Sequence, residues 1–376
     1  MYVLQALFLS RRPAIAFVVV GLFWGCFAAY VPEVKTRIGV SDANFGLLLL
    51  CNAVGLVSAM FLAPRLDCIL GARGMQVSSI LFAFTFLLPG FAPNVLTFGI
   101  SMAIVGAASG LADVLMNARV SELEQLHCRP LMNANHAMFS VGYAASAFAS
   151  GFAREAYIQP GLAFFYVALI VLVLSIFLYM PVRDNPTLGP GAVDYPFWLI
   201  VICGFIVLVA FMIEATVETW SALHIERTLH GGAAEGALGP AVLGIMMAVG
   251  RFSGQAVSQL FSDTKVIIFA TLVAASGAVV AAMAPTPYWA YLGFGVLGLG
   301  VSVIGPLGLA LVGRSVDTHL RTEAISRVAV MGFAGFFLAP TLMGLVSEFH
   351  GLRVAFLCAA ALCLTVIPLT FLVRRF

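Results

Sequence analysis

Long apolar runs constrain the fold of this chain more than any other feature. A helix needs about 20 apolar residues to cross the ~30 Å hydrocarbon core of a bilayer, because each residue adds about 1.5 Å along the axis. Runs of this kind, separated by Pro, Gly or charged residues, recur near residues 13–31, 43–63, 75–92, 95–118, 131–152, 161–181, 197–221, 240–261, 266–284, 288–312, 324–346 and 354–373. The pattern predicts an all-α integral membrane protein with twelve transmembrane helices.

The composition excludes a soluble globular protein. Hydrophobic residues make up 62% of the chain and charged residues only 10%, against about 25% charged residues in soluble domains. The net charge of +2, without a basic cluster, predicts no nucleic-acid partner. The seven Cys residues are scattered without a CxxC, and no HExxH or P-loop occurs, so we expect no metal and no cofactor. The expected partners are the lipid bilayer and a small solute, with the chain as a monomer.

The twelve runs form two sets of six, separated by the Pro- and Gly-rich stretch VRDNPTLGPGAVDYP. This predicts an N-terminal six-helix bundle at 1–182, a short cytoplasmic linker at 183–196 and a C-terminal six-helix bundle at 197–376. A shift of 195 residues lays AVGLVSAMFLA over AVGRFSGQAVS and Arg119 over Arg314. These weak repeats favour two pseudo-symmetric bundles of the same orientation.

The distribution of Lys and Arg predicts the orientation in the membrane. If both termini are cytoplasmic, twelve of the nineteen Lys and Arg lie on the cytoplasmic side and five on the opposite side, while Arg251 and Arg327 fall within helices. The excess predicts cytoplasmic termini.

Six short stretches carry a resemblance to a known family. They are GLADVLMNA, NANHAMFSVGYAASAF, IEATVETW, VGRFSGQ, GLGVSVIGPLGLALVG and EFHGLRVAFL. Together with the two sets of six helices, they resemble the major facilitator superfamily, and within it the branch of bacterial fucose permease and its small inner-membrane relatives. The resemblance implies a bacterial inner-membrane transporter that alternates between inward-open and outward-open states, driven by a proton gradient.

The resemblance also points to individual residues. It places Asp113 where the fucose permease has an acid in its fourth helix, and Ala28 where that permease has an acid in its first helix. Glu214 matches an acid of the small relatives. The stretch APRLDCILGARG departs from the family pattern after the second helix, and it leaves Asp67 and Arg73 as candidate gating residues.

Asp113 is the most informative single residue, because it lies inside the apolar run near 95–118. A charged side chain at mid-membrane costs about 2.5–3.5 kcal/mol on insertion scales, and desolvation favours the neutral acid. An acid that gains and loses a proton in a cavity suits proton coupling. Asn117 lies four residues later on the same helix face, where it is a candidate for substrate binding. The alternative is a buried acid that only locks helices together.

His136 is a second candidate for proton coupling and substrate binding. Asp113 lies six residues before Arg119 and His136 six residues after Pro130, so both lie about 9 Å from the cytoplasmic boundary. At equal depth they can share a proton if their faces turn together. Asn135 is a candidate for substrate binding in the same cavity. The alternative for His136 is a packed polar residue.

The run near 197–221 supplies two further acids. Glu214 and Glu218 are spaced i and i+4, so they share a helix face. Glu214 lies roughly 10 Å from the outer boundary and is a candidate for proton coupling. Glu218 is a candidate for substrate binding, and Trp220 has the expected position of an interfacial Trp.

The remaining candidates are two Arg and two aromatic residues. Arg251 is a candidate for gating that can also pair with Glu214, and Arg327 is a candidate for a cytoplasmic gate. Trp24 and Tyr30 can stack on a sugar-like ring, although packing is the alternative for both. The runs near 75–92, 161–181, 266–284 and 354–373 are expected to face lipid or scaffold.

These features predict a proton-coupled secondary transporter of a sugar, polyol or sugar acid, working by symport, and no enzyme activity. One alternative is an exporter of a metabolite or drug by proton antiport. Others are a membrane-embedded enzyme with Asp113 and His136 as an acid–base pair, or a solute sensor that does not transport.

Overall fold

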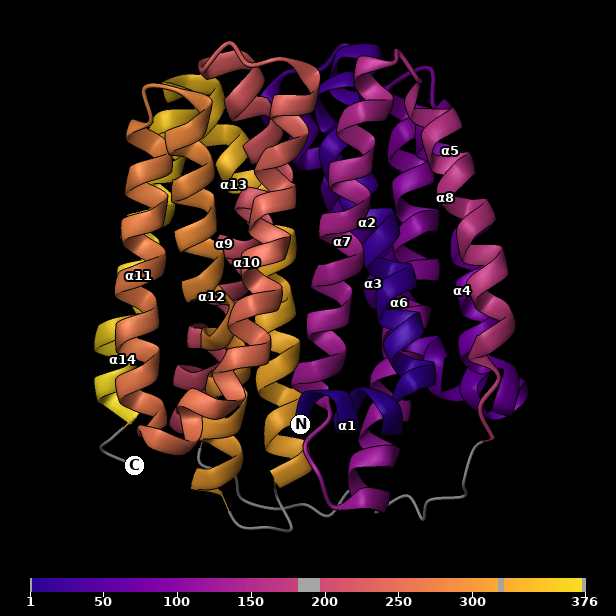
Figure 1. Ribbon diagram of the computed structural model, residues 1–376, viewed down its shortest axis with the longest axis vertical. Helices are drawn as coiled ribbons and strands as arrows, with labels where there is room; N and C mark the ends of the chain where they lie inside the picture. Colours follow the sequence, from indigo (N-terminus) through magenta and orange to yellow (C-terminus); the bar gives the residue numbers. More distant parts are fainter. Residues whose placement is uncertain (1, 182–196, 317–320, 374–376) are drawn as a thin grey trace.

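The computed structural model describes residues 2–181, 197–316 and 321–373, and every regular element in these residues is a helix. Figure 1 shows the long helices running side by side along the long axis of the molecule. The linker expected at 183–196 lies outside the described residues. We use first half for residues 2–181 and second half for 197–373.

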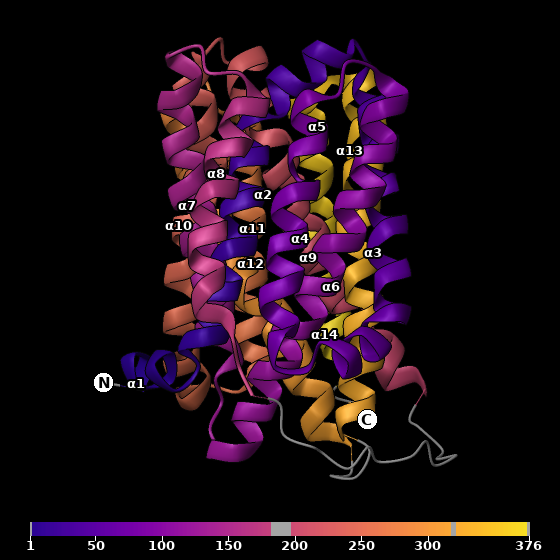
Figure 2. The ribbon, with the colours of Figure 1, turned by 90° about the vertical axis from the view of Figure 1, so that its right-hand side faces the viewer.

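The first half contains eight α-helices. They are α1 (Tyr2–Leu9), α2 (Arg11–Ile38), α3 (Asp42–Leu70), α4 (Gly74–Thr85), α5 (Leu87–Phe91), α6 (Val95–His127), α7 (Met132–Glu155) and α8 (Pro160–Ser175), with single 3-10 turns at Gly71–Arg73 and Ile176–Leu178. The short helix α1, which the apolar pattern did not predict, lies across the long axis at one end of the bundle (Figure 2).

The second half contains six α-helices. They are α9 (Phe197–Leu223), α10 (Ala233–Leu260), α11 (Asp263–Met283), α12 (Pro287–Ser315), α13 (Arg321–Leu364) and α14 (Val366–Val373), with one π-helical turn at His224–Thr228. Helix α13 contains the predicted span at 324–346 and the first part of the span at 354–373, and the two spans are separated by a kink at Gly351. This residue has a φ of 80°, a conformation that glycine adopts without the strain of a side chain.

All twelve predicted spans are helical, and the predicted all-α membrane fold is confirmed. By length and hydropathy, nine helical stretches among the described residues can cross a membrane, and two of them, Asp42–Phe91 and Ala324–Val373, are 50 residues long and contain two spans each. Helix α7 is absent from that set, and its sequence is rich in Ala, Gly and Ser and carries Asn133, Asn135 and His136 near its start. Such a helix suits the interior of a bundle rather than the lipid.

Local signals in the sequence explain where helices begin and end. Helix α2 ends at Gly39, which has a φ of 68° and donates its N–H to carbonyls of the last turn. Helix α3 begins after Ser41, whose hydroxyl accepts from the N–H of Asn44 at 3.3 Å. Helix α6 begins with a reciprocal capping box between Asn94 and Thr97.

The two halves repeat the same contacts, as the sequence repeat predicts. A side chain at Gly55 would meet the backbone of Ala103 on α6, and a side chain at Gly250 would meet Ser302 on α12. Each glycine therefore lets the second long helix of its half approach the fourth. Equivalent ion pairs join Asp67 to Arg119 in the first half and Asp263 to Arg314 in the second.

Two helix pairs carry much of the packing between the halves. Figure 2 shows α7 beside α10 and α3 beside α13. Gly46 of α3 lies so close to α13 that an added Cβ would be 2.3 Å from the carbonyl oxygen of Pro340. Large exposed apolar side chains gather on α4, α8, α11 and α14, for example Phe84, Ile170, Phe269 and Phe371. These four helices contain the runs that were expected to face lipid.

Candidate functional site

A central cavity of about 190 Å³ lies between the two halves. Helices α2, α3, α6 and α7 line it from the first half and α9 and α13 from the second. Its polar lining residues are Asn52, Ser109, Asp113, Tyr143, Glu218 and Thr219. Its aromatic lining residues also include Trp24, Phe27, Phe139, Phe333, Phe336 and Phe337.

Asp113 lines the central cavity from α6. The side-chain amide of Asn117 donates to its Oδ1 at 3.2 Å and to its backbone carbonyl at 2.8 Å. The predicted i, i+4 pairing therefore exists, but Asn117 itself is not among the cavity-lining residues. Ala28, where the family resemblance implies an acid, also lines this cavity.

The two acids of α9 have different surroundings. Glu214 is buried and ion-paired with Arg251 of α10, whose Nη2 lies 3.0 and 3.2 Å from its two carboxylate oxygens. Glu218, one turn later, lines the central cavity. Among the described residues it has no hydrogen-bond or ion-pair partner. The expected interfacial position of Trp220 is wrong, because its side chain is fully buried and packs edge-on against Phe45 of the first half.

Arg251 also connects the two halves inside the helix bundle. Its Nη1 donates to the hydroxyl of Ser140 and to the backbone carbonyl of His136, both on α7. The arginine lines a second cavity of about 310 Å³, together with Pro130, Asn133, Ser302 and Arg314. We call this the α1-side cavity, because it adjoins the start of α7 and the last turn of α12, at the end of the bundle that carries α1.

The structure brings only some of the predicted residues to the central cavity. The imidazole of His136 packs edge-on against Phe17 at a centroid distance of 4.8 Å, and no hydrogen bond or ion pair within the described residues joins it to Asp113. Asn135 is buried, and its amide donates to the Ser10 hydroxyl at 2.9 Å. This contact fastens the start of α2 to α7.

The two aromatic candidates of α2 also differ in whether they line the central cavity. Trp24 lines the central cavity. Tyr30 is fully buried, and its hydroxyl donates to the backbone carbonyl of Ile158 at 2.9 Å. Tyr30 thus packs the helix ends of the first half, as the alternative interpretation supposed.

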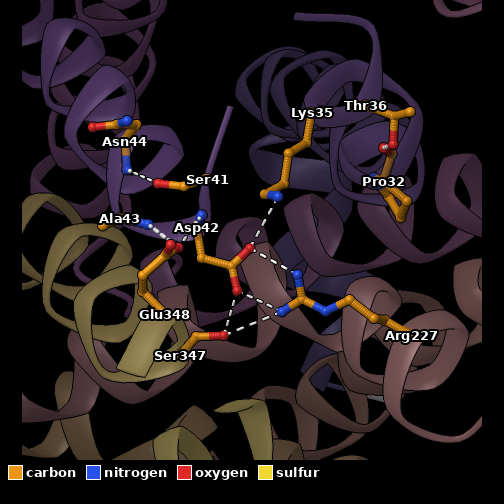
Figure 3. Close-up of polar contacts among 10 residues, drawn as sticks. All are labelled: Pro32, Lys35, Thr36, Ser41, Asp42, Ala43, Asn44, Arg227, Ser347 and Glu348. Carbon is orange, nitrogen blue, oxygen red and sulfur yellow. Dashed lines mark hydrogen bonds and ion pairs between the residues drawn. The ribbon is translucent and has the colours of Figure 1, made fainter. Parts of the chain in front are cut away.

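Ionic contacts close the end of the bundle that carries α5. In Figure 3, the Asp42 carboxylate accepts hydrogen bonds from Arg227 at 2.9 Å and from the Ser347 hydroxyl, and pairs with Lys35 at 3.0 Å. The carboxylate of Glu348 accepts from the backbone N–H of Asp42 at 2.8 Å. Because Lys35 and Asp42 belong to the first half and the other three residues to the second, this Asp42 cluster ties the halves together.

A second cluster at the same end is centred on Arg154. This guanidinium is buried at the end of α7 and donates to Glu33 of the first half and to Glu226 of the second, each at 3.0 Å. It also donates to the backbone carbonyl of Ala233 at 3.2 Å. We call this the Arg154 cluster, and it crosses between the halves as the Asp42 cluster does.

Two sets of ion pairs at the α1 end each lie within one half. Arg119 is buried and pairs with both Asp67 and Glu122 of the first half, while Arg314 pairs with Asp263 of the second half at 2.5 Å. Asp67, a predicted gating residue, therefore has Arg119 as its cation. Two of the other three predicted gating residues, Arg73 and Arg327, are exposed.

Several residues of the site were not predicted from the sequence. Tyr143 lines the central cavity and is only 1% exposed, and its hydroxyl has no hydrogen-bond partner in the described part of the chain. Phe333, Phe336 and Phe337 line it from α13, and their i, i+3, i+4 spacing was the available signal for a common face. No group of three or more His, Cys, Asp or Glu in the described part of the chain could hold a metal ion.

Comparisons with known proteins agree with this arrangement. The Major Facilitator Superfamily pattern matches residues 14–258 and 200–375. An uncharacterized MFS-type transporter of Yersinia pestis is 31% identical over 94% of this chain and 92% of that protein. The membrane protein MosC of Rhizobium meliloti is 28% identical over 92% of this chain and 85% of that protein.

Solved structures show the same fold at low sequence identity. A D-xylose-proton symporter superposes with a TM-score of 0.75 at 17% identity, covering 96% of this chain and 98% of that one. The nucleoside transporter NupG gives a TM-score of 0.70 at 13% identity over 98% of this chain and 99% of that one. From the family pattern, the relatives and the two halves around a central cavity, the chain belongs to the Major Facilitator Superfamily, a family of membrane transporters and not of enzymes.

Proposed function

We propose that this protein is a proton-coupled secondary transporter that moves a small polar solute by alternating access, with proton and solute travelling in the same direction. The observation that carries the proposal is the position of Asp113. This carboxylate lines a cavity between the halves, and among the described residues its only hydrogen-bond donor is the amide of Asn117. A neutral amide leaves the carboxylate free to exchange a proton, whereas the Glu214 carboxylate is held in an ion pair with Arg251 at 3.0 Å.

Residues 1–182 and 197–376 are, in this proposal, the two domains that rock about the central cavity, with 183–196 as the linker. The Lys and Arg excess at the α1 end supports a cytoplasmic position for that end. The cavity volume of about 190 Å³ is below the roughly 300–1,000 Å³ of sites for drug-sized ligands. A solute of monosaccharide size, such as a sugar, polyol or sugar acid, fits this volume better than a large drug, and the resemblance to the fucose-permease branch supports the same class.

The experiment that tests coupling is the Asp113→Asn variant in proteoliposomes. A thermal-shift screen of sugars, polyols and sugar acids first selects the labelled solute. The amide keeps the size of the side chain and fixes it in a neutral form, so uptake driven by a pH gradient should disappear. Exchange of labelled for unlabelled solute should survive, because the loaded carrier can still reorient.

Two outcomes would contradict the proposal. In the first, gradient-driven accumulation persists in Asp113→Asn but is lost in Glu214→Gln. The proton-binding residue would then be Glu214 of the second half. A protein that binds the solute but shows no counterflow would be a sensor rather than a transporter. Proton antiport remains the second candidate direction, and solute-driven proton efflux, in place of proton uptake, would establish it.

A further inference from the structure

We propose that the transported solute carries a positively charged ammonium group and that Glu218 is the carboxylate that binds it. This inference rests on the proposed transport function and names the chemical class of its substrate, which is then a small polar solute with an amine and not a sugar acid. It assigns the proton to Asp113 of the first half and the cationic group of the solute to Glu218 of the second half.

The charges around the central cavity are of one sign. Asp113 and Glu218 are its charged lining residues, and its described lining contains no Lys or Arg. Arg251 is the cation that acts electrostatically on Glu218, but its guanidinium is bonded to Glu214, Ser140 and the His136 carbonyl. A cavity with walls of low dielectric focuses such a potential, so it attracts cations and repels anions.

Within the described part of the chain, Glu218 differs from Asp113 and Glu214 in having no hydrogen-bond or ion-pair partner. Glu214 has Arg251 at 3.0 Å and Asp113 has the Asn117 amide at 3.2 Å, whereas no hydrogen bond or ion pair reaches Glu218 from the described residues. An unpaired carboxylate inside a membrane protein is costly. A solute ammonium group would supply the missing charge and the missing hydrogen-bond donors.

The aromatic lining favours the same class of ligand. Trp24 and Phe27 enter the cavity from α2, Phe139 from α7, and Phe333 and Phe336 from α13. The faces of aromatic rings attract ammonium groups, most strongly where water is excluded. An anionic solute would instead meet two carboxylates and the negative faces of these rings.

Tyr143 provides an independent sign that a polar ligand belongs here. Its ring lines the cavity, its side chain is 1% exposed, and its hydroxyl has no hydrogen-bond partner among the residues that the structure describes. Buried hydroxyls are normally paired. The Tyr143 hydroxyl can accept a hydrogen bond from an ammonium N–H or donate one to a hydroxyl of the same solute.

The test uses ligand sets that share a carbon frame and differ in charge. One set is glucosamine, glucose and glucuronate; another is ethanolamine, ethylene glycol and glycolate; a third is choline and its uncharged carbon isostere. Thermal-shift titrations of the full-length protein in detergent give an apparent affinity for each ligand at constant pH and ionic strength. Wild type, Glu218→Gln and Glu155→Gln are compared. Glu155 is an exposed acid at the end of α7, outside the cavity, so its variant controls for the loss of one negative charge.

We expect at least one ammonium ligand to bind wild type more tightly than its neutral and anionic counterparts. Glu218→Gln should weaken that ligand by about tenfold or more, because it replaces a charge-assisted hydrogen bond by a neutral one. The neutral counterpart should change by less than about twofold, and Glu155→Gln should behave like wild type. If Glu218→Gln alters the fold, Glu218→Asp provides a second readout, since it should keep the charge preference.

The inference is overturned if no ammonium ligand binds, if neutral or anionic members bind as tightly, or if Glu218→Gln leaves the preference intact. Loss of the preference in Asp113→Asn but not in Glu218→Gln would also overturn the assignment of roles. Ammonium binding that depends on Glu218, without counterflow in proteoliposomes, would contradict the proposed transport function but support the ligand class. Counterflow of a neutral sugar without ammonium binding would support the transport function but contradict the ligand class.

Discussion

The two ends of the helix bundle differ in where their ion pairs run. At the α5 end, the Asp42 and Arg154 clusters join residues of the first half to residues of the second. At the α1 end, Asp67–Arg119 and Asp263–Arg314 each stay within one half. Close helix packing follows the same division, because Gly46 meets Pro340 toward the α5 end, while the α1-side cavity opens beside Asn133 and Arg314.

This difference separates the contacts that stabilise each half from the contacts that stabilise one conformation of the whole molecule. In the proposed transport cycle, contacts within a half are kept when the halves rock, so they set the shape of each half. Contacts between halves must break and re-form, so they set the balance between conformations. The described residues thus have the α5 end closed, and the α5-end clusters are the contacts that opening has to break.

Loss of the Arg154 guanidinium should have the largest effect on this closed end. Arg154→Met removes a buried cation and leaves Glu33 and Glu226 without their shared partner. Breaking a buried pair in this way costs about 3–5 kcal/mol. Hydrogen exchange should rise in peptides covering Glu33 and the 224–236 turn, and the melting temperature should fall. Unchanged exchange at these peptides would show that the cluster does not hold the end closed.

Neutralising Asp42 should have the next largest effect. Asp42→Asn removes the charge that accepts from Arg227 and Ser347 and pairs with Lys35, which should cost about 1.5–3 kcal/mol. A double-mutant cycle with Arg227→Gln, followed by chemical denaturation in detergent, measures the interaction free energy between the Asp42 and Arg227 side chains. Full additivity of the two substitutions would contradict a direct interaction between these side chains.

Separating α3 from α13 should lower the stability of the contact between the halves without any change of charge. In Gly46→Ala the new Cβ would lie 2.3 Å from the Pro340 carbonyl oxygen, so the two helices must separate, at a cost of about 1–3 kcal/mol. Gly295→Ala is the matched control, because its nearest neighbours are side-chain atoms of Val242 and Met246 at 3.3 and 3.4 Å within the same half. Equal loss of thermal stability in both variants would argue against a special role for the contact between halves.

Breaking a pair at the α1 end should have the smallest effect. The Arg314 side chain is 63% exposed, and exposed ion pairs contribute about 0–1 kcal/mol. Arg314→Gln should therefore leave hydrogen exchange at the α5 end unchanged. A rise as large as that of Arg154→Met would mean that the two ends are coupled more tightly than their separate contacts suggest.

The sequence was sufficient for the fold because the bilayer acts on every residue of a span. The requirement for about 20 apolar residues located all twelve spans, and the cost of a buried acid singled out Asp113 and the α9 acids. The i, i+4 spacing also explained the contact between Asn117 and Asp113.

The tertiary contacts of the site were harder to predict. Asp42 meets Arg227, and Arg154 meets Glu226, only because the halves face each other, and no local pattern encodes such pairs. Equal depth in the membrane did not bring His136 to Asp113, because depth does not fix the rotation of a helix about its axis. Trp220 fits both an interface and a core by composition, and only packing against Phe45 decides between them.

Reversible cross-linking of the α5 end tests alternating access most directly. Ala43 and Glu348 face each other across the halves, with 3.5 Å between the Ala43 nitrogen and the Glu348 carboxylate. The variant Ala43→Cys/Glu348→Cys, with the exposed Cys68, Cys128 and Cys358 changed to Ser, is treated with a short reducible bis-methanethiosulfonate in proteoliposomes. The same protein before cross-linking, and each single Cys variant, serve as controls. Counterflow should stop when the link forms and return when it is reduced, because the closed end must open once in every cycle. Full counterflow in the cross-linked protein would contradict the account.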